Sequence, residues 1–252
     1  MIYAMYFSPT GSSRKNAIEV AKVFDDEFIS LDLTVLNAIK LPTFTKDDLV
    51  IFSCPVYMGR IYTGVFKALE KIQGHGASCI GLATYGNRHY DEALNELCTF
   101  AKSKDFRPIS AAALIGQHTY GTIATGRPNE EDLNQTRNFF TKVKRDFLKG
   151  DMKELSSLTT FQSTEACWGG RFRPLTSDQC TACGLCSREC PTQAISYDNY
   201  KDIDDEKCIA CFRCIKVCPV HAKNMNTSKY EEFAEAFTLK LANERENQYF
   251  KS

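Results

Sequence analysis

The sequence predicts an α/β protein in two parts: a doubly wound, five-stranded parallel sheet over residues 1–150, then a small cysteine-rich α+β region. Two observations favour this class. In the first part, short apolar runs alternate with segments of helical periodicity, a pattern typical of a parallel sheet covered by helices. In the second part, eight of the twelve cysteines fall within residues 180–218, in two copies of one spacing.

The elements of the first part follow from this alternation. The expected strands are the apolar runs at residues 2–7, 28–33, 49–54, 78–84 and 109–115. The expected helices have apolar residues at helical spacing and cover residues 14–24, 65–72, 92–102 and 129–148. Asn129 precedes three acidic residues, so we expect it to be the N-cap of the last of these helices.

Three unusual loops follow the first, third and fourth expected strands, at residues 8–13, 55–60 and 84–91. The first reads Ser8-Pro-Thr-Gly-Ser-Ser13 and enters a helix, whose N-terminal amides and dipole favour an anion. It lacks the ending of a Walker phosphate loop and the Gly-x-Gly-x-x-Gly fingerprint, and an ordinary helix cap is the alternative. Because ligands of doubly wound sheets bind outside the carboxyl ends of the strands, we expect the loops to meet in one crevice.

The cysteine-rich region contains Cys-x2-Cys-x2-Cys-x3-Cys-Pro twice, with the eight cysteines Cys180, Cys183, Cys186, Cys190, Cys208, Cys211, Cys214 and Cys218. This spacing is typical of [4Fe-4S] sites, in which three cysteines of a run bind one cluster and the fourth crosses to the other. We therefore expect two clusters, with Cys218 completing the first set and Cys190 the second. Structural zinc and disulfides are alternatives that fit this spacing and composition less well.

Composition excludes several classes of function. The formal net charge is zero, with 31 basic and 31 acidic residues, which argues against a nucleic-acid-binding surface. We expect no membrane span, because no apolar run is long enough, and no signal peptide, because the N-terminus lacks a basic leader. The remaining four cysteines are scattered, so a reduced, cytoplasmic and anaerobic setting is expected.

Both parts resemble known families. Residues 1–150, through the loop at 8–13, resemble flavodoxins, whose phosphate loop reads Thr/Ser-x-Thr-Gly-x-Thr. The cysteine runs, with Pro191-Thr-Gln-Ala-Ile195 after the first, resemble bacterial two-[4Fe-4S] ferredoxins. One departure is Phe212, where the first run has Gly184, because only glycine takes a positive φ at little cost. The combination resembles the small flavodoxin–ferredoxin fusion proteins of anaerobes.

The resemblance implies strand order 2-1-3-4-5 and an FMN site. The phosphate would be bound by Ser8, Thr10, Gly11, Ser12 and Ser13. The isoalloxazine would lie beside Pro55, Val56, Tyr57, Met58, Gly59, Thr84, Tyr85, Gly86, Asn87 and Tyr90. Of these, Tyr57 or Tyr85 could stack on the ring. His118, in a long loop after the fifth strand, could be structural or could bind flavin or substrate.

The expected domains are an FMN-binding domain at 1–150, a linker at 151–170, a two-cluster ferredoxin domain at 171–226 and a C-terminal helix at 227–252. We expect Trp168 to pack between the domains. The expected function is electron transfer between the clusters and FMN, with a redox protein as donor or acceptor. A flavin-dependent reductase of a small organic or quinone acceptor and a redox sensor without FMN are the alternatives. No catalytic residue is assigned, and no dinucleotide fingerprint indicates direct oxidation of NAD(P)H.

Overall fold

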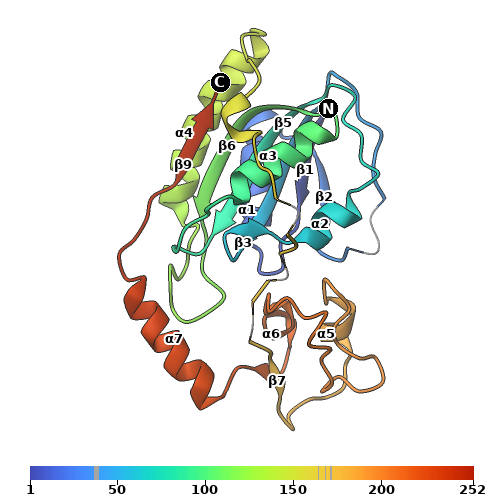
Figure 1. The fold of residues 1–252 in the computed structure, drawn as a ribbon, viewed down its shortest axis with the longest axis vertical. Coiled ribbons are helices and arrows are strands. Elements are labelled where there is room, and N and C mark those ends of the chain that lie inside the picture. Colours follow the sequence, from blue (N-terminus) through green and yellow to red (C-terminus); the bar gives the residue numbers. More distant parts are fainter. Residues whose placement is uncertain (37–39, 164, 168, 171) are drawn as a thin grey trace.

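A computed structural model describes residues 1–36, 40–163, 165–167, 169–170 and 172–252. It consists of an α/β domain with the cysteine-rich region placed below the carboxyl ends of its strands (Figure 1). Trp168 lies outside the described residues, so its expected position between the domains stays a prediction.

The central sheet has the order that the resemblance implies. Five strands run parallel in the order β2-β1-β3-β5-β6, which is the flavodoxin-like order. Their bounds are β1 (Ile2–Tyr6), β2 (Ile29–Asp32), β3 (Leu49–Tyr57), β5 (Ser78–Tyr85) and β6 (Arg107–Ile115). β2 lies on one side of β1, and the later strands β3, β5 and β6 follow on the other side. The order of the strands therefore switches between β1 and β3, and a ligand crevice is expected at the carboxyl ends of these two strands.

Helices cover both faces of the sheet (Figure 1). On one face, α1 (Ser12–Phe24) and α4 (Glu130–Leu148) bury Val20 and Phe140 against the strands. On the other face, α2 (Thr63–Ala68) and α3 (Ala93–Ser103) bury Val65 and Leu97. Asn129 caps α4 as expected, because its side chain accepts a hydrogen bond from the Asp132 amide at 3.0 Å.

The loop after β3 differs from the expected turn at 55–60. β3 continues to Tyr57 and forms a hairpin with β4 (Arg60–Ile61), so the turn consists of Met58 and Gly59 alone. Both residues have positive φ, 51° and 83°, as a two-residue hairpin turn requires. Met58 therefore stands at the tip of the hairpin, where it is 78% exposed.

The C-terminal segment is not helical throughout, so the expected helix at 227–252 is too long. α7 (Ser228–Lys240) ends at residue 240, and the chain returns to the sheet, where β9 (Gln248–Lys251) pairs antiparallel with β6 (Figure 1). Tyr249 and Phe250 point to opposite faces of the sheet and join the two cores. The sheet thus has a further edge strand, and its completion depends on residues that follow the cysteine-rich region.

The cysteine-rich region has the expected α+β structure. It contains β7 (Leu175–Thr176), α5 (Leu185–Arg188), α6 (Arg213–Val217) and β8 (Lys223–Asn224), with β7 and β8 paired antiparallel. The preceding segment, with a 3-10 turn η1 (Ser156–Leu158), runs along the α/β domain. There the Leu155 amide donates to the Pro108 carbonyl at 2.7 Å, and the Cys167 amide donates to Thr63 Oγ1 at 2.8 Å. Within the described ranges, no helix is long and apolar enough to cross a membrane.

Candidate cofactor sites

The loop between β1 and α1 is fixed by hydrogen bonds of its own. Ser8 Oγ accepts from the Arg14 amide at 2.9 Å, and the Ser8 amide donates to Thr34 Oγ1 at 3.0 Å. Gly11 has φ of 100°, which lets the chain turn directly into α1. The loop is therefore preorganised at a helix N-terminus. Thr34 was not among the expected residues, because its contact arises only once β2 lies beside β1.

Three adjoining cavities, of about 50, 450 and 270 Å³, lie along this edge of the sheet. His118 and Thr119 line all three, so the cavities adjoin one another around these two residues. Eleven of the expected cofactor-binding residues line them: Ser8, Thr10, Ser12, Ser13, Pro55, Val56, Tyr57, Met58, Thr84, Tyr85 and Gly86. The structure thus brings the three loops together in one crevice.

Asn87 and Tyr90, also expected beside the flavin, direct their side chains elsewhere. The Asn87 amide group donates to the Leu241 carbonyl at 2.8 Å and accepts from the Arg245 amide at 2.8 Å. The Tyr90 hydroxyl donates to Gln248 Oε1 at 2.7 Å. These two side chains therefore hold the C-terminal segment. Gly11 and Gly59, the other expected residues, do not line the cavities in the part of the chain that the structure describes.

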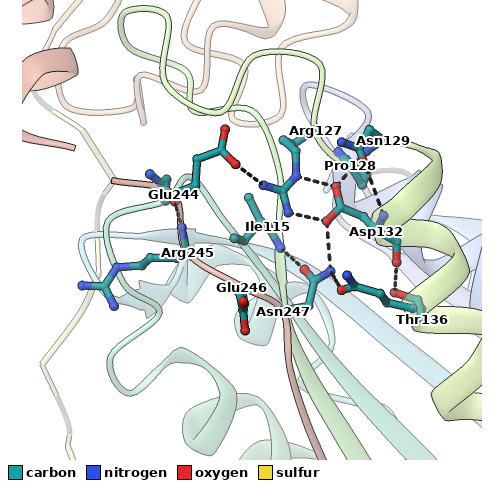
Figure 2. A network of polar contacts seen from close by, with 12 residues as sticks. Ile115, Arg127, Pro128, Asn129, Asp132, Thr136, Glu244, Arg245, Glu246 and Asn247 are labelled. Carbon is teal, nitrogen blue, oxygen red and sulfur yellow. Dashed lines mark hydrogen bonds and ion pairs between the residues drawn. The ribbon is translucent and has the colours of Figure 1, made fainter. Parts of the chain in front are cut away.

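Figure 2 shows a second set of contacts that fixes the C-terminal segment. Asn247 Oδ1 accepts from the Ile115 amide at 2.8 Å, and Asn247 Nδ2 donates to Asp132 Oδ1 at 3.0 Å. Asp132 is also paired with Arg127. The end of β6, the start of α4 and the segment before β9 are thus tied together.

Tyr57 lies between the sheet loops and the cysteine-rich region. It lines the 50 and 450 Å³ cavities. Burial raises the pKa of Tyr57, and the neighbouring Cys211 raises the pKa further. Tyr85, by contrast, is 2% exposed, and its hydroxyl donates to the Glu246 carbonyl at 3.0 Å. Stacking on a flavin stays a prediction for both tyrosines.

His118 is neutral at physiological pH. Burial lowers the pKa of His118 to about 4. The Tyr120 amide donates to His118 Nδ1 at 2.8 Å, so the single ring proton resides on Nε2. Gly86 permits this position, because a Cβ there would lie 2.4 Å from His118 Cδ2. His118 can therefore offer one hydrogen-bond donor to a bound group.

The eight cysteines of the two runs line two separate cavities. We call Cys180, Cys183, Cys186 and Cys218 the outer set, which lines the first cavity. We call Cys190, Cys208, Cys211 and Cys214 the inner set, which lines the second. Each cavity receives three cysteines of one run and the last cysteine of the other, the arrangement that crossed ligation predicts. A [4Fe-4S] cube takes four cysteine ligands, the number that each set supplies, and the ligation itself stays a prediction.

The two sets differ in exposure. Cys183 of the outer set is exposed, whereas Cys190, Cys211 and Cys214 of the inner set are buried. Burial raises the pKa of the Cys211 thiol and raises that of Cys214 to about 12. Because iron binds thiolate, these cysteines would hold a cluster only in their deprotonated form.

Phe212 adopts the backbone conformation of its glycine counterpart. Its φ is 59°, close to the 73° of Gly184, so both runs make the same turn. Packing of its ring offsets the free-energy cost of placing a phenylalanine in the left-handed region of backbone conformation. The Phe212 ring lies 5.3 Å from the ring of Tyr120 and 6.1 Å from that of Tyr230. Phe212 lines both the inner-set cavity and the 270 Å³ cavity, so it forms the wall between them.

Residues outside the expected site complete the crevice. Ala210, which precedes Cys211, lines the 450 Å³ cavity together with Phe233 and Phe237 of α7. Lys216 of α6 lines the 270 Å³ cavity. Sequence periodicity found α7, but nothing in the sequence indicated that it covers this crevice.

Comparison with known proteins identifies the cysteine-rich region, since residues 179–228 match the 4Fe-4S dicluster domain family. An uncharacterized protein of Methanocaldococcus jannaschii, MJ0298, is 26% identical over 136 residues, which cover 51% of this chain and 90% of that protein. A flavodoxin from the domain Archaea covers 57% of this chain and 96% of its own, with a TM-score of 0.43 and 11% identity. Flavodoxin 1 from Bacillus cereus covers 59% and 97%, with a TM-score of 0.40 and 15% identity.

The family match and the strand order together define the architecture. The chain joins a flavodoxin-like α/β domain to a 4Fe-4S domain.

Proposed function

We propose that this protein is an electron-transfer iron–sulfur flavoprotein, in which electrons pass between two [4Fe-4S] clusters and FMN. One observation carries the proposal: the 450 Å³ cavity beside the sheet loops is also lined by Ala210, the neighbour of Cys211 in the inner set. A cluster passes one electron at a time, whereas a flavin takes up one or two. A shared boundary between the two sites suits this exchange.

The crevice has the chemistry that FMN requires. Thr10 and Ser12 offer hydroxyls beside the N-terminus of α1, and Lys216 adds a positive charge from the cluster domain. Hydroxyls, first-turn amides and a cation suit a phosphate. Tyr57 and Gly86 lie further along the crevice, where the ring would be placed, and His118 Nε2 supplies a donor there.

The two clusters have different tasks in this proposal. The inner cluster lies next to the flavin crevice, whereas the outer cluster lies behind the exposed Cys183. The rate of electron transfer depends on how closely the two carriers approach each other, and an external carrier can approach the outer cluster more closely than the inner one. An external carrier would therefore exchange electrons at the outer cluster. The proposed partner is therefore a redox protein that docks near Cys183.

A second candidate function is reduction of a small organic or quinone acceptor. The 450 Å³ cavity favours it, because Phe233 and Phe237 of α7 provide apolar walls and Arg88 provides a cation. A cavity of this volume lies in the range of small-molecule sites.

Anaerobic purification followed by absorbance, flavin, iron and sulfide analysis tests the proposal. We expect stoichiometric FMN, with iron and sulfide for two cubane clusters. Mixing with a reduced one-electron carrier should then reduce the flavin only in protein that retains its clusters. Clusters without any bound flavin would support a sensor or scaffold instead. Rapid reduction of FMN by NADH alone would contradict the proposed route, and turnover of a small acceptor would favour the reductase.

A further inference from the structure

A lysine is buried beside the outer cysteine set. Lys223 is 2% exposed and lines the same cavity as the four outer cysteines. Its Nζ donates to the Tyr200 carbonyl at 2.6 Å. An ammonium has three donors, and a buried charge is costly unless an opposite charge compensates it. A buried cation thus lines the cavity, and the negative charge that compensates it must come from groups around the same cavity.

Within the described part of the chain, no carboxylate forms an ion pair with Lys223. The nearby groups that can carry negative charge are cysteine sulfurs. Four of them, the outer set, line the same cavity as Lys223, whose side chain is buried there.

The equivalent position of the first run carries no charge. The runs continue as Pro191-Thr-Gln-Ala-Ile195 and Pro219-Val-His-Ala-Lys223. In each, the alanine amide donates to the last cysteine of its own run, at 3.3 Å for Cys190 and 3.2 Å for Cys218. The backbones therefore correspond, and Ile195, 3% exposed, lines the inner cavity where Lys223 lines the outer one.

We propose that the positive charge of Lys223 raises the reduction potential of the outer cluster relative to that of the inner cluster. Uptake of one electron makes a thiolate-bound cluster more negative, so a fixed cation stabilises the reduced form more than the oxidised form. Salt and water screen a buried cation only weakly. The exposed outer cluster then accepts an electron readily from a carrier protein. This inference rests on the two-cluster part of the proposed function and not on FMN.

Redox titration of the anaerobically purified full chain, monitored by EPR, tests the proposal. Lys223→Met keeps the length of the side chain without its charge, and Lys223→Gln also keeps a donor for the Tyr200 carbonyl. Both variants should shift the reduction of the outer cluster to a more negative potential and shift that of the inner cluster less, with iron and sulfide content unchanged. Cys183→Ser shows which reduction step of the titration belongs to the outer cluster, because this variant should alter that step more than the other.

Ile195→Met is the matched control, since it changes shape but not charge at the equivalent position. It should leave the outer step in place. An unchanged outer step in both Lys223 variants would overturn the proposal, and so would an equal shift in Ile195→Met. Loss of the outer cluster from both Lys223 variants would also overturn it, because Lys223 would then build the site instead of tuning it. Protein with both clusters and no FMN would contradict the proposed function and still permit this titration.

Discussion

Arg213, which lies between two cysteines of the inner set, donates a hydrogen bond from Nη1 to the Pro9 carbonyl at 3.2 Å. The contact joins the inner-cluster loop to the loop at 8–13, more than two hundred positions away in the sequence. Arg213 is also paired with Glu189, which precedes the inner-set residue Cys190. The cluster site and the proposed phosphate site are therefore held together by one side chain.

Replacing Arg213 should slow electron transfer between the inner cluster and the flavin. A hydrogen bond from a charged group contributes about 1.5–3 kcal/mol, so Arg213→Gln should weaken the docking of the two loops by roughly tenfold or more. The rate of flavin reduction after cluster reduction can be followed by rapid-mixing absorbance. FMN and iron content should stay unchanged. Lys207→Gln, in the same domain, is the charge control, and equal rates in both variants would contradict the role of Arg213.

Lys216 should contribute to binding of the FMN phosphate but not of the ring. The side chain is exposed, so a contribution of about 0.2–1 kcal/mol is expected, and Lys216→Gln should weaken FMN binding up to a few-fold. Fluorescence titration of flavin-free protein with FMN and with riboflavin separates the two parts of the ligand. Arg188→Gln, at the equivalent position of the first run, is the control. An equal loss of riboflavin affinity would mean that Lys216 does not act on the phosphate.

Most of the sheet could be predicted from the sequence, because buried parallel strands are continuous apolar runs bounded by loops. β9 could not, since its four residues follow a polar segment and gain their apolar contacts only beside β6. The return of the C-terminal segment to the sheet also explains why the side chains of Asn87 and Tyr90 do not line the crevice. Their position after a strand end indicated a ligand site, but a distant segment of the chain binds their side chains.

The cysteine sets could be anticipated because their spacing encodes them. Lys216 is different, since only the docking of the two domains brings it to the crevice. Lys223 had a signal that a comparison of the two runs would have found: a lysine stands where the first run has Ile195. Because both side chains are buried beside the cysteines, this difference in sequence places a positive charge beside the outer set and an apolar group beside the inner set.

The C-terminal segment should stabilise the α/β domain. Asn247→Ala removes the acceptor of the buried Ile115 amide and a partner of Asp132, so the free energy of unfolding should fall by about 1–3 kcal/mol. Denaturant unfolding of anaerobic protein, followed by far-UV circular dichroism, measures this change. Asn226→Ala, at an exposed position outside the helices and strands, is the control. Equal stability of Asn247→Ala and the wild type would mean that the two hydrogen bonds of Asn247 add little to the stability of the α/β domain.

His118 should make the protein less stable in acid. Burial lowers the pKa of His118 to about 4 in the folded state, whereas an unfolded histidine titrates near 6.5. Between these values the unfolded chain binds a proton that the folded chain does not. The free energy of unfolding therefore falls as the pH is lowered from about 6.5 to 4, by at most about 1.4 kcal/mol per pH unit.

His118→Gln removes this contribution, so its stability should depend less steeply on pH in that window than the stability of the wild type. Above about pH 6.5 the two pH profiles should run parallel. Thermal unfolding at several pH values gives the comparison. His75→Gln, at an exposed position, should retain the wild-type slope. If His118→Gln also retains it, the ring is protonated equally in the folded and unfolded chains.

The last cysteine of each run should control the cluster of the other run. Cys190 lines the cavity of Cys208, Cys211 and Cys214, although it belongs to the first run in sequence. Cys190→Ser should therefore perturb the inner cluster and leave the outer one largely intact, and Cys218→Ser should do the reverse. Serine oxygen is a poorer ligand for iron than thiolate, so the affected cluster should become labile or lose one iron.

EPR of the two variants, beside Cys183→Ser, distinguishes crossed from uncrossed ligation. Cys183 and Cys218 line one cavity, so their variants should give the same altered signal, and Cys190→Ser should give a different one. The comparison needs no assignment of the signals in advance, because it asks only which two variants agree. If Cys183→Ser instead matches Cys190→Ser, each run closes its own site, and the two cavities do not hold the clusters as proposed.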